Sequence, residues 1–287
     1  METNKQQRIS TMKEWSVYTA QYIRILFSDK KNLMVSMLFP VIAALVVVWI
    51  AGKDMFVHYN GTKSACFVLV SSAIWGGLFN SIQTVVKERA NIKRDYVTGL
   101  RIRCYTASRA IVQFGLCVVQ SAILTLSFIG VKVCYDNQLP ETGIEFGNPL
   151  IEYYISLLLL MYAADMMGLM ISCMVKKTET ANVLAPYILI VQLIFSGILF
   201  EMKGIAEKVS YLMVSRWGME ALGSICDLNN MQLKIQMEVP NVPHDPEDMF
   251  TYSGHHLAFV WLVLVAFILV CVTVGNLLLH RVSKDSR

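Results

Sequence analysis

Two groups of ionisable residues in this sequence have a type and position that could do chemistry. The first is a single acid, Asp165, near the middle of an apolar run long enough to cross a membrane. A carboxylate at that depth is costly and is a functional candidate for binding a proton or a substrate. A structural interpretation also stays open, because Ala164, Gly168 and Ser172 form a stripe of small residues that suits close helix packing. Asp165 would then hydrogen-bond across a helix interface.

The second group is a basic cluster at residues 85–110, VVKERANIKRDYVTGLRIRCYTASRA. Seven Lys or Arg residues crowd there, with Glu88 and Asp95 among them. Such a segment is either a solvated turn or a helix that docks on a partner through ion pairs, which suit a polar interface that opens and recloses.

Other sequence signatures of chemistry are absent. The chain contains no GxxxxGK[ST] loop for ATP and none of the HExxH, GxSxG or CxxC motifs. We therefore expect a chain that is not an enzyme, with no catalytic residue, no metal site and no cofactor-binding residue of its own. Cys66, Cys134 and Cys226 fall near one predicted face of the membrane, and spacing cannot decide whether two of them form a disulfide.

The elements that must position these residues are membrane helices. Of the 287 residues, 55% are hydrophobic and 16% are charged, and the mean hydropathy is +0.50. Soluble domains have about 45–50% apolar and about 25% charged residues. Since a membrane helix needs roughly 20 apolar residues, the sequence predicts an all-α integral membrane protein with six transmembrane helices, at about 33–51, 64–86, 110–133, 151–175, 182–201 and 257–279.

The distribution of positive charge predicts the orientation. Of the 25 Lys and Arg residues, 18 lie in the N-terminal segment, in the loops after the second and fourth spans, and in the C-terminal tail. The positive-inside rule therefore places both termini in the cytoplasm, beneath the plasma membrane, with loop 87–109 cytoplasmic and loop 202–256 external. The net charge of +4 is explained by the excess of Lys and Arg in the predicted cytoplasmic segments. It is therefore no sign of a nucleic-acid partner, and we expect none.

Residues 1–32 are predicted to be a cytoplasmic tail with an interfacial helix, followed by the six-span domain at 33–287. In residues 11–27, apolar and aromatic side chains recur at steps of three and four, whereas Lys13, Glu14, Gln21 and Arg24 are expected to face elsewhere. This pattern is typical of an amphipathic helix lying on membrane lipid. The residues on its apolar face are Trp15, Tyr18, Tyr22, Ile25 and Leu26.

Two stretches resemble the membrane domain of type-2 ABC exporters, the class that includes the G-subfamily transporters. Lys87-Glu88-Arg89, then Arg94-Asp95-Tyr96 and Gly99, is similar to that family's E…R-E-x-x-x-G pattern, with Asp95 in place of the usual Glu. FSGILF at 195–200, followed by SRWGMEAL at 215–222, is similar to its S-G-x-x-x and P/S-R-[YW]-x-x-x-A-L motifs. With the amphipathic N-terminal helix and the order of spans, the resemblance covers nearly the whole chain.

The resemblance implies a permease subunit of an ATP-driven exporter, with short re-entrant helices in loop 202–256. A second copy, or a similar permease, would complete the pathway, and an ABC ATP-binding subunit would drive it. Because nothing precedes the N-terminal helix, we expect that ATPase, with its ATP and Mg, on a separate subunit.

The resemblance also implies roles for individual residues. The residues that would couple to the ATPase are Lys87, Glu88, Arg89, Arg94 and Asp95. The substrate path would be lined by Ser72, Trp75, Phe79, Ile190 and Leu193, with Ile198 and Leu199 as an apolar outer gate. The aromatic residues could instead face lipid or pack within one subunit.

A mostly apolar cavity with aromatic walls favours a hydrophobic or amphipathic substrate (peptide, lipid or drug), because a strongly hydrated solute would lose its water there. Alternating access of a dimer would move it outward. The alternative is an ATP-independent secondary transporter or channel subunit that uses Asp165. An inverted internal repeat would favour that alternative, and the sequence shows none.

Overall fold

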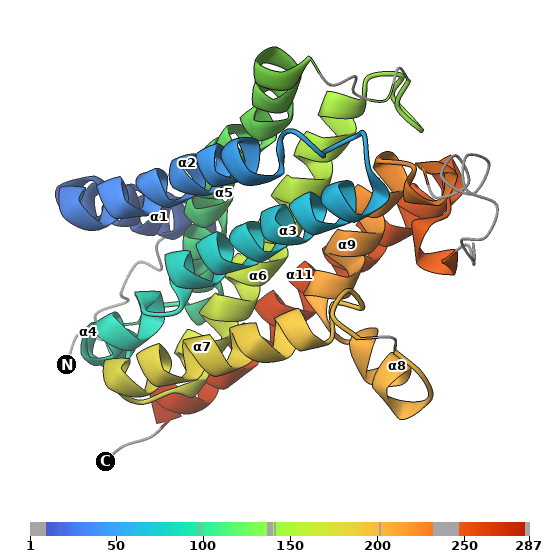
Figure 1. The fold of residues 1–287 in the computed structure, drawn as a ribbon. Helices are drawn as coiled ribbons and strands as arrows, with labels where there is room; N and C mark the ends of the chain where they lie inside the picture. The colour runs from blue at the N-terminus through green and yellow to red at the C-terminus, as the bar shows by residue number, and fades with distance from the viewer. Residues whose placement is uncertain are drawn as a thin grey trace, which may run out of the picture.

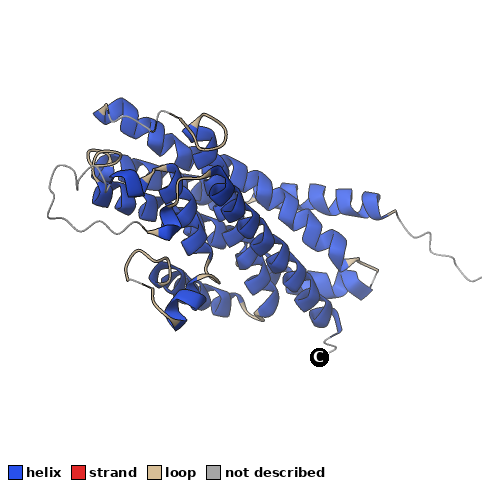
Figure 2. Cartoon of the chain, turned by 90° about the vertical axis from the view of Figure 1, so that its right-hand side faces the viewer, coloured by secondary structure: helices blue, strands red, loops and turns tan. Residues whose placement is uncertain are grey.

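The computed structural model of the chain describes residues 10–97, 99–136, 140, 142–200, 202–231 and 247–284. This described part consists of helices and loops and holds no strand, so the predicted all-α class is confirmed there (Figure 2). The helices are α1 (Thr11–Ser28), α2 (Lys30–Ala51), α3 (Tyr59–Ser81), α4 (Thr84–Val97), α5 (Ile102–Tyr135), α6 (Pro149–Met174), α7 (Thr178–Ile194), α8 (Ile205–Ser210), α9 (Val214–Ile225), the 3-10 helix η1 (Asp248–Phe250) and α11 (Gly254–Lys284).

Five helices of the described residues are long and apolar enough to cross a membrane: α2, α3 with its continuation into α4, α5, α6 and α11. The predicted fifth span, 182–201, corresponds to α7, a shorter apolar helix that ends at Ile194, so the predicted end is wrong. The helix stops there for two reasons. The Ser196 hydroxyl donates to the Leu193 carbonyl at 2.7 Å, and Gly197 has a φ of 83°, a left-handed conformation that glycine adopts more easily than other residues.

The predicted second span, 64–86, is not one helix. It divides at Ile82 and Gln83, where α3 ends and α4 begins. The Ser172 hydroxyl of α6 accepts hydrogen bonds from the backbone N–H groups of Val85 and Val86, at 3.0 and 3.1 Å. Amides in the first turn of a helix have no partner within it. A side chain from another helix thus supplies the cap that starts α4.

Helix α6 lies at the centre of the bundle and packs against α3 and α11 (Figure 1). The stripe of small residues on α6 meets small residues on α3. A Cβ atom built on Gly77 would overlap the Met161 carbonyl oxygen, and one on Gly168 would lie 2.7 Å from the Leu78 carbonyl oxygen. The packing role that the sequence suggested for this stripe is therefore confirmed, and glycine is needed because the backbones come so close.

The two ends of the bundle carry different elements (Figure 1). Helices α1 and α4 and the C-terminal end of α11 gather at one end, whereas α9 and η1 lie at the other. The predicted coupling segment and the predicted external segment thus lie at opposite ends of the molecule. The predicted loop 87–109 is mostly helix, since α4 runs to Val97 and α5 starts at Ile102.

Helix α1 is amphipathic as predicted, but two residues differ. Tyr22 is buried, and Trp15 and Tyr18 are half-buried. Ile25, expected on the apolar face, is exposed. Glu14, expected on the outer face, turns inward because it accepts a hydrogen bond from the Arg101 N–H at 2.7 Å and pairs with the Arg101 guanidinium at 3.4 Å.

We predict that Gly77→Ala destabilises the protein by about 1–3 kcal/mol, because the added methyl group forces α3 away from the α6 backbone. The matched control is Gly115→Ala on α5, where no atom lies within 4 Å of the added Cβ. Thermal unfolding in detergent should show a lower midpoint for Gly77→Ala and none of that loss for Gly115→Ala. Equal midpoints for the two variants would contradict the close α3–α6 contact.

Candidate functional site: the junction of α1, α4 and α5

The end of the bundle that holds α4 is built around one buried ion pair. Arg109 of α5 has a side chain only 3% exposed, and its guanidinium pairs with Glu88 of α4, which is 19% exposed. The Tyr105 hydroxyl donates to the same Glu88 oxygen at 2.8 Å. We call Tyr22, Glu88, Tyr105 and Arg109 the α4 junction. Removing one partner of such a pair is costly, because it strands a charge away from water.

Helix α1 completes the junction. The Arg109 guanidinium carbon lies 3.7 Å from the centre of the Tyr22 ring and 4.6 Å from that of Tyr105, which places the cation against two aromatic faces. The Gln113 amide donates to the Tyr22 hydroxyl at 2.8 Å and to the Asn80 carbonyl at 3.0 Å. Burial raises the pKa of Tyr22 to about 12, so its hydroxyl stays protonated at neutral pH.

Helix α4 is also tied to α6. Besides the cap from Ser172, the Arg89 guanidinium donates to the carbonyl oxygen of Val175, just beyond the last turn of α6. One side of α4 is therefore held by contacts with two other helices, α5 and α6. Its hydrophobic residues Val85, Val86 and Ile92 are buried on that same side.

The opposite side of α4 faces outward. Lys87 and Arg94 are exposed, and the Arg94 side chain is 76% exposed while it pairs with its neighbour Asp95 at 3.5 Å. Of the five predicted coupling residues, the structure thus turns Glu88 and Arg89 inward and leaves Lys87 and Arg94 on the surface. Their predicted contact with an ATPase stays a prediction.

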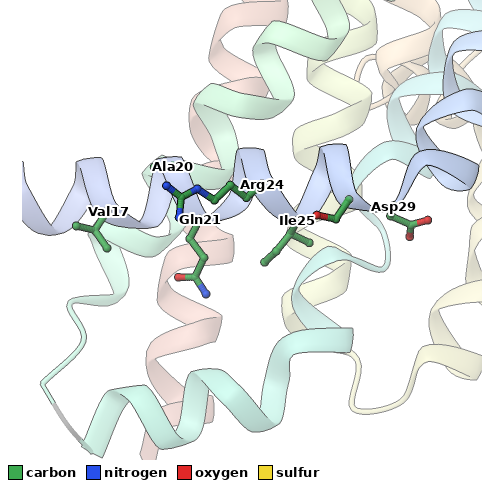
Figure 3. A pocket seen from close by; sticks show the side chains of 7 residues that line it. Val17, Ala20, Gln21, Arg24, Ile25 and Asp29 are labelled. Atoms are coloured by element: carbon green, nitrogen blue, oxygen red, sulfur yellow. The ribbon is translucent and has the colours of Figure 1, made fainter.

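Two hollows adjoin the junction. A small cavity of about 40 Å³ lies between α1, α4 and α5 and is lined by Glu88 and Arg109, among others. A larger open groove of about 890 Å³ runs along α1 (Figure 3). Its lining combines apolar and polar side chains of α1 and of the residue that follows it: Val17, Ala20, Gln21, Arg24, Ile25, Ser28 and Asp29.

The predicted path residues lie on the outer surfaces of two neighbouring helices, α3 and α7. Trp75 and Phe79 are exposed on α3, with their ring centres 5.8 Å apart, and Ser72 donates to the Val68 carbonyl one turn earlier. On α7, Ile190 is exposed and Leu193 is half-buried. These residues form apolar surface rather than core.

The predicted gate residues follow α7 in the turn at 195–200. The Ile198 N–H donates to the Ser196 hydroxyl at 3.4 Å, Ile198 packs partly against the core, and Leu199 is exposed. Sequence reasoning gave no role to Gln192, which fixes this turn to α9. Its side-chain oxygen accepts from the Ser215 N–H at 3.0 Å, and its backbone carbonyl accepts from the Ser215 hydroxyl.

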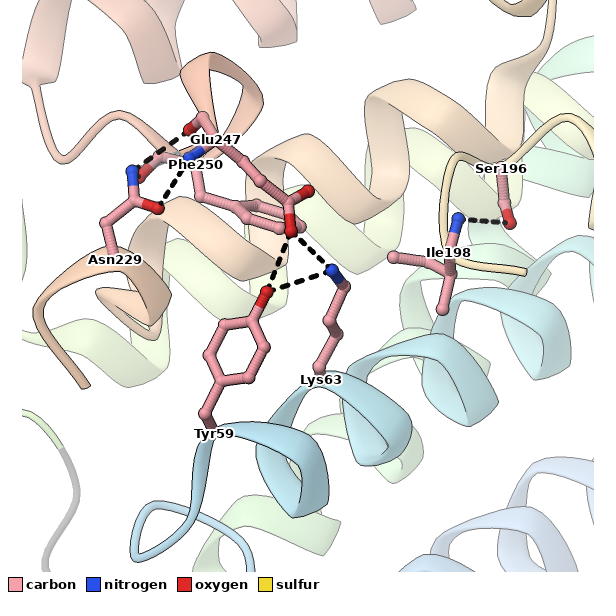
Figure 4. A network of polar contacts seen from close by, with 7 residues as sticks. All are labelled: Tyr59, Lys63, Ser196, Ile198, Asn229, Glu247 and Phe250. Carbon is pink, nitrogen blue, oxygen red and sulfur yellow. Dashed lines mark hydrogen bonds and ion pairs between the residues drawn. The ribbon is translucent and has the colours of Figure 1, made fainter. Parts of the chain in front are cut away.

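A polar cluster holds η1 against the start of α3, on the same side as Ile198 (Figure 4). Glu247 accepts from Lys63 at 2.6 Å and from the Tyr59 hydroxyl at 2.8 Å. Asn229 brackets the segment by donating to the Glu247 and Phe250 carbonyls at 3.0 and 3.2 Å. Residues 232–246, which the sequence assigned to the external loop, lie outside the described residues.

A second buried carboxyl, Glu220 of α9, links α9 to α11. It lies 3.2 Å from His256 Nε2 of α11 and 3.7 Å from Arg216 Nε of α9. Burial raises the pKa of Glu220 from 4.5 to about 7, and the Arg216 charge opposes part of that rise.

Asp165 lies fully buried in α6, among α3 and α5 rather than on the predicted path. Its side chain accepts a hydrogen bond from the Cys117 thiol at 3.3 Å, and its backbone carbonyl accepts from the Ser81 hydroxyl. Within the described chain, its other carboxyl oxygen, Oδ1, has no hydrogen-bond partner.

Comparison with known proteins gives two findings. A family model described as "ABC-2 type transporter" matches residues 13–225. The chain is also similar to the "ABC transporter ATP-binding/permease protein Rv1747" of Mycobacterium tuberculosis, with 26% identity over an alignment of 262 positions that covers 88% of this chain. The chain spans 28% of the length of that relative.

We predict that Arg109→Ala costs about 3–5 kcal/mol of stability, because it leaves Glu88 without its buried partner. Glu88→Gln in the Arg109→Ala background should restore part of the loss, since it removes the stranded charge. Thermal unfolding of the single and double variants measures both effects. Arg103→Ala, an exposed arginine on the same helix, is the control, and an equal effect of Arg103→Ala and Arg109→Ala would refute the junction.

Glu220 predicts how stability depends on pH. Because the folded protein holds the Glu220 proton more tightly than the unfolded chain, this group stabilises the fold below pH 4.5, and the contribution is lost as the pH rises to about 7. The unfolding midpoint should fall across that window in the wild type and fall less in Glu220→Gln. The exposed Glu207 of α8 gives the control Glu207→Gln, which should keep the wild-type slope.

Proposed function

The chain belongs to the ABC-2 type transporter family, and we propose that it is the permease of an ATP-driven exporter that moves a hydrophobic or amphipathic substrate out of the cytoplasm or inner leaflet. Membership of the family, together with several long apolar helices, makes it a multi-pass membrane protein and a transport permease. The direction of transport, the energy source and the substrate class are the proposed parts.

The observation that carries the proposal is the asymmetry of α4. One face of this helix is clamped to α5 and α6 through Glu88, Arg89 and the cap from Ser172. The other face presents Lys87 and Arg94 to solvent. A helix held this rigidly, with a charged outer face, is suited to receive force from a docked partner and pass it to the bundle.

An ATP-binding domain is that partner. The 287 residues contain no P-loop motif, so ATP and Mg would be bound by a different domain, which we place on a separate subunit. The M. tuberculosis relative is named as both an ATP-binding protein and a permease, and the present chain spans 28% of its length. The name indicates that an ATP-binding part and a permease part can also be joined in one chain. In either arrangement, the outer face of α4 is the docking surface.

Orientation and assembly follow from the charge distribution and the family. The termini and α4 lie in the cytoplasm beneath the plasma membrane, with α8, α9 and η1 at the outer surface and α8–α9 re-entering the membrane. α7 serves as the fifth of the six spans. Two permeases, either two copies of this chain or this chain and a similar one, form a path by alternating access. The exposed apolar surface of α3 and α7, including Trp75, Phe79 and Ile190, supports such a path.

A carrier that works without ATP through Asp165 is less well supported. Asp165 contacts Cys117 inside the bundle and is fully buried, and the family whose model matches the chain is one of ABC transporters.

Charge reversal on α4 tests the proposal. The double variant Lys87→Glu/Arg94→Glu, reconstituted in vesicles with the ATPase that co-purifies with the chain, should bind that ATPase at least about tenfold more weakly and lose ATP-stimulated transport, because like charges then meet at the interface. Lys132→Glu, an exposed lysine at the other end of α5, is the matched control. The proposal fails if no ATPase co-purifies or if the variant and the control transport equally.

A further inference from the structure

We propose that Cys66 and Cys226 form a disulfide that fastens α9 to α3 at the outer side of the membrane. The inference rests on the proposed orientation, which places both residues on the external side. Three cysteines lie toward that side, and sequence spacing left every pairing among them open. The structure favours one pairing.

The two thiols lie next to each other although 160 positions separate them in the chain. Cys66 is in the second turn of α3, Cys226 directly follows the last turn of α9, and their sulfur atoms are 3.5 Å apart. A disulfide bond is about 2.05 Å long, so closure requires an approach of about 1.5 Å. Helices α3 and α9 already pack against each other, which keeps the backbones in place.

Neither sulfur has an alternative cysteine within reach. Both side chains are fully buried, and the remaining neighbour of Cys226 is the Tyr153 hydroxyl of α6, at 3.2 Å. Cys134, the third cysteine near this side, is exposed in the last turn of α5. Cys117 contacts Asp165 in the middle of the bundle. The geometry therefore selects Cys66–Cys226 and leaves Cys134 as a thiol.

The reaction is a thiol–disulfide exchange that precedes burial. A disulfide of an external oxidoreductase is attacked by one cysteine thiolate to give a mixed disulfide, and the second cysteine thiolate then displaces the oxidoreductase. The two cysteines lose two electrons and two protons in forming the S–S bond. The oxidoreductase disulfide takes up those electrons and protons and leaves as a dithiol.

The bond would connect two parts of the predicted transport route. Helix α3 carries Trp75 and Phe79 on its outer surface, and α9 holds the end of α7 through the bonds between Ser215 and Gln192. A covalent link from α3 to α9 would therefore fix the position of the turn that holds Ile198 and Leu199 relative to α3. Reduction would loosen this outer layer without touching the α4 junction.

Thiol counting in the full chain tests the disulfide. Cells expressing the protein are dissolved in SDS containing a small alkylating agent, which reaches the buried thiols once the fold is lost. The agent is then removed, and a maleimide-polyethylene glycol is added with or without a reductant. If this blocking step is omitted in a parallel sample, the seven cysteines should give five adducts without reductant and seven with it. In the blocked sample, only the two cysteines released by later reduction should react.

Variants identify the pair. Cys226→Ser should give six adducts in the unblocked sample whether or not reductant is present, because Cys66 becomes free. Cys134→Ser, the matched control, should keep the difference of two. Seven adducts in the unreduced wild type would overturn the proposal, and so would a Cys134→Ser variant that lost the difference.

A membrane-impermeant maleimide on intact cells separates this inference from the proposed function. Labelling of the exposed Cys134 together with seven free thiols would refute the disulfide and leave the proposed orientation intact. If Cys134 is inaccessible from outside, the orientation fails, and seven free thiols in the same cells would refute the disulfide as well. External labelling of Cys134 with five free thiols supports both.

Discussion

The Arg109 guanidinium lies between the rings of Tyr22 and Tyr105, with the Glu88 carboxylate at its edge. This cation cannot lose its proton and has almost no access to water, so its surroundings must supply its partners. One helix provides the carboxylate, a second provides an aromatic face, and a third provides the cation and the other aromatic face. The position of each helix is thereby fixed by the needs of a single charge.

Other features of this end of the molecule depend on that arrangement. Ser172 caps α4 and Arg89 holds the end of α6, so α4 is fixed to the central helix as well as to the junction. α6 in turn packs against α3 through glycines that bring the backbones together. A force applied to the outer face of α4 would therefore reach α1, α5 and α6 at once. We therefore expect these helices to move as one body when an ATP-binding partner docked on α4 changes its conformation.

Much of the fold could be predicted from the sequence because a membrane helix requires a long run of apolar residues, which is visible in the sequence alone. The amphipathic helix and the small-residue stripe on α6 follow from local pattern in the same way, whereas the pattern of the basic segment left a turn and a helix both open. What the sequence could not predict depends on tertiary contacts. The break between α3 and α4 is set by Ser172, 87 residues away, and the inward turn of Glu14 is set by Arg101. Glu88 belongs to a recognisable motif, but nothing near it in the sequence identified Arg109 and Tyr105 as its partners.

If the chain works as proposed, α1 and α4 keep a fixed geometry relative to each other while ATP drives the transporter. Spin labels at Val17 of α1 and Val97 of α4, which are 62% and 86% exposed, would measure it by electron double resonance in the complex with the ATP-binding partner. Labels attached to unnatural amino acids avoid the seven native cysteines. We predict the same distance distribution in the nucleotide-free and nucleotide-trapped states. A shift of several ångströms between the two states would show that α1 and α4 move relative to each other and that the α4 junction does not hold them together.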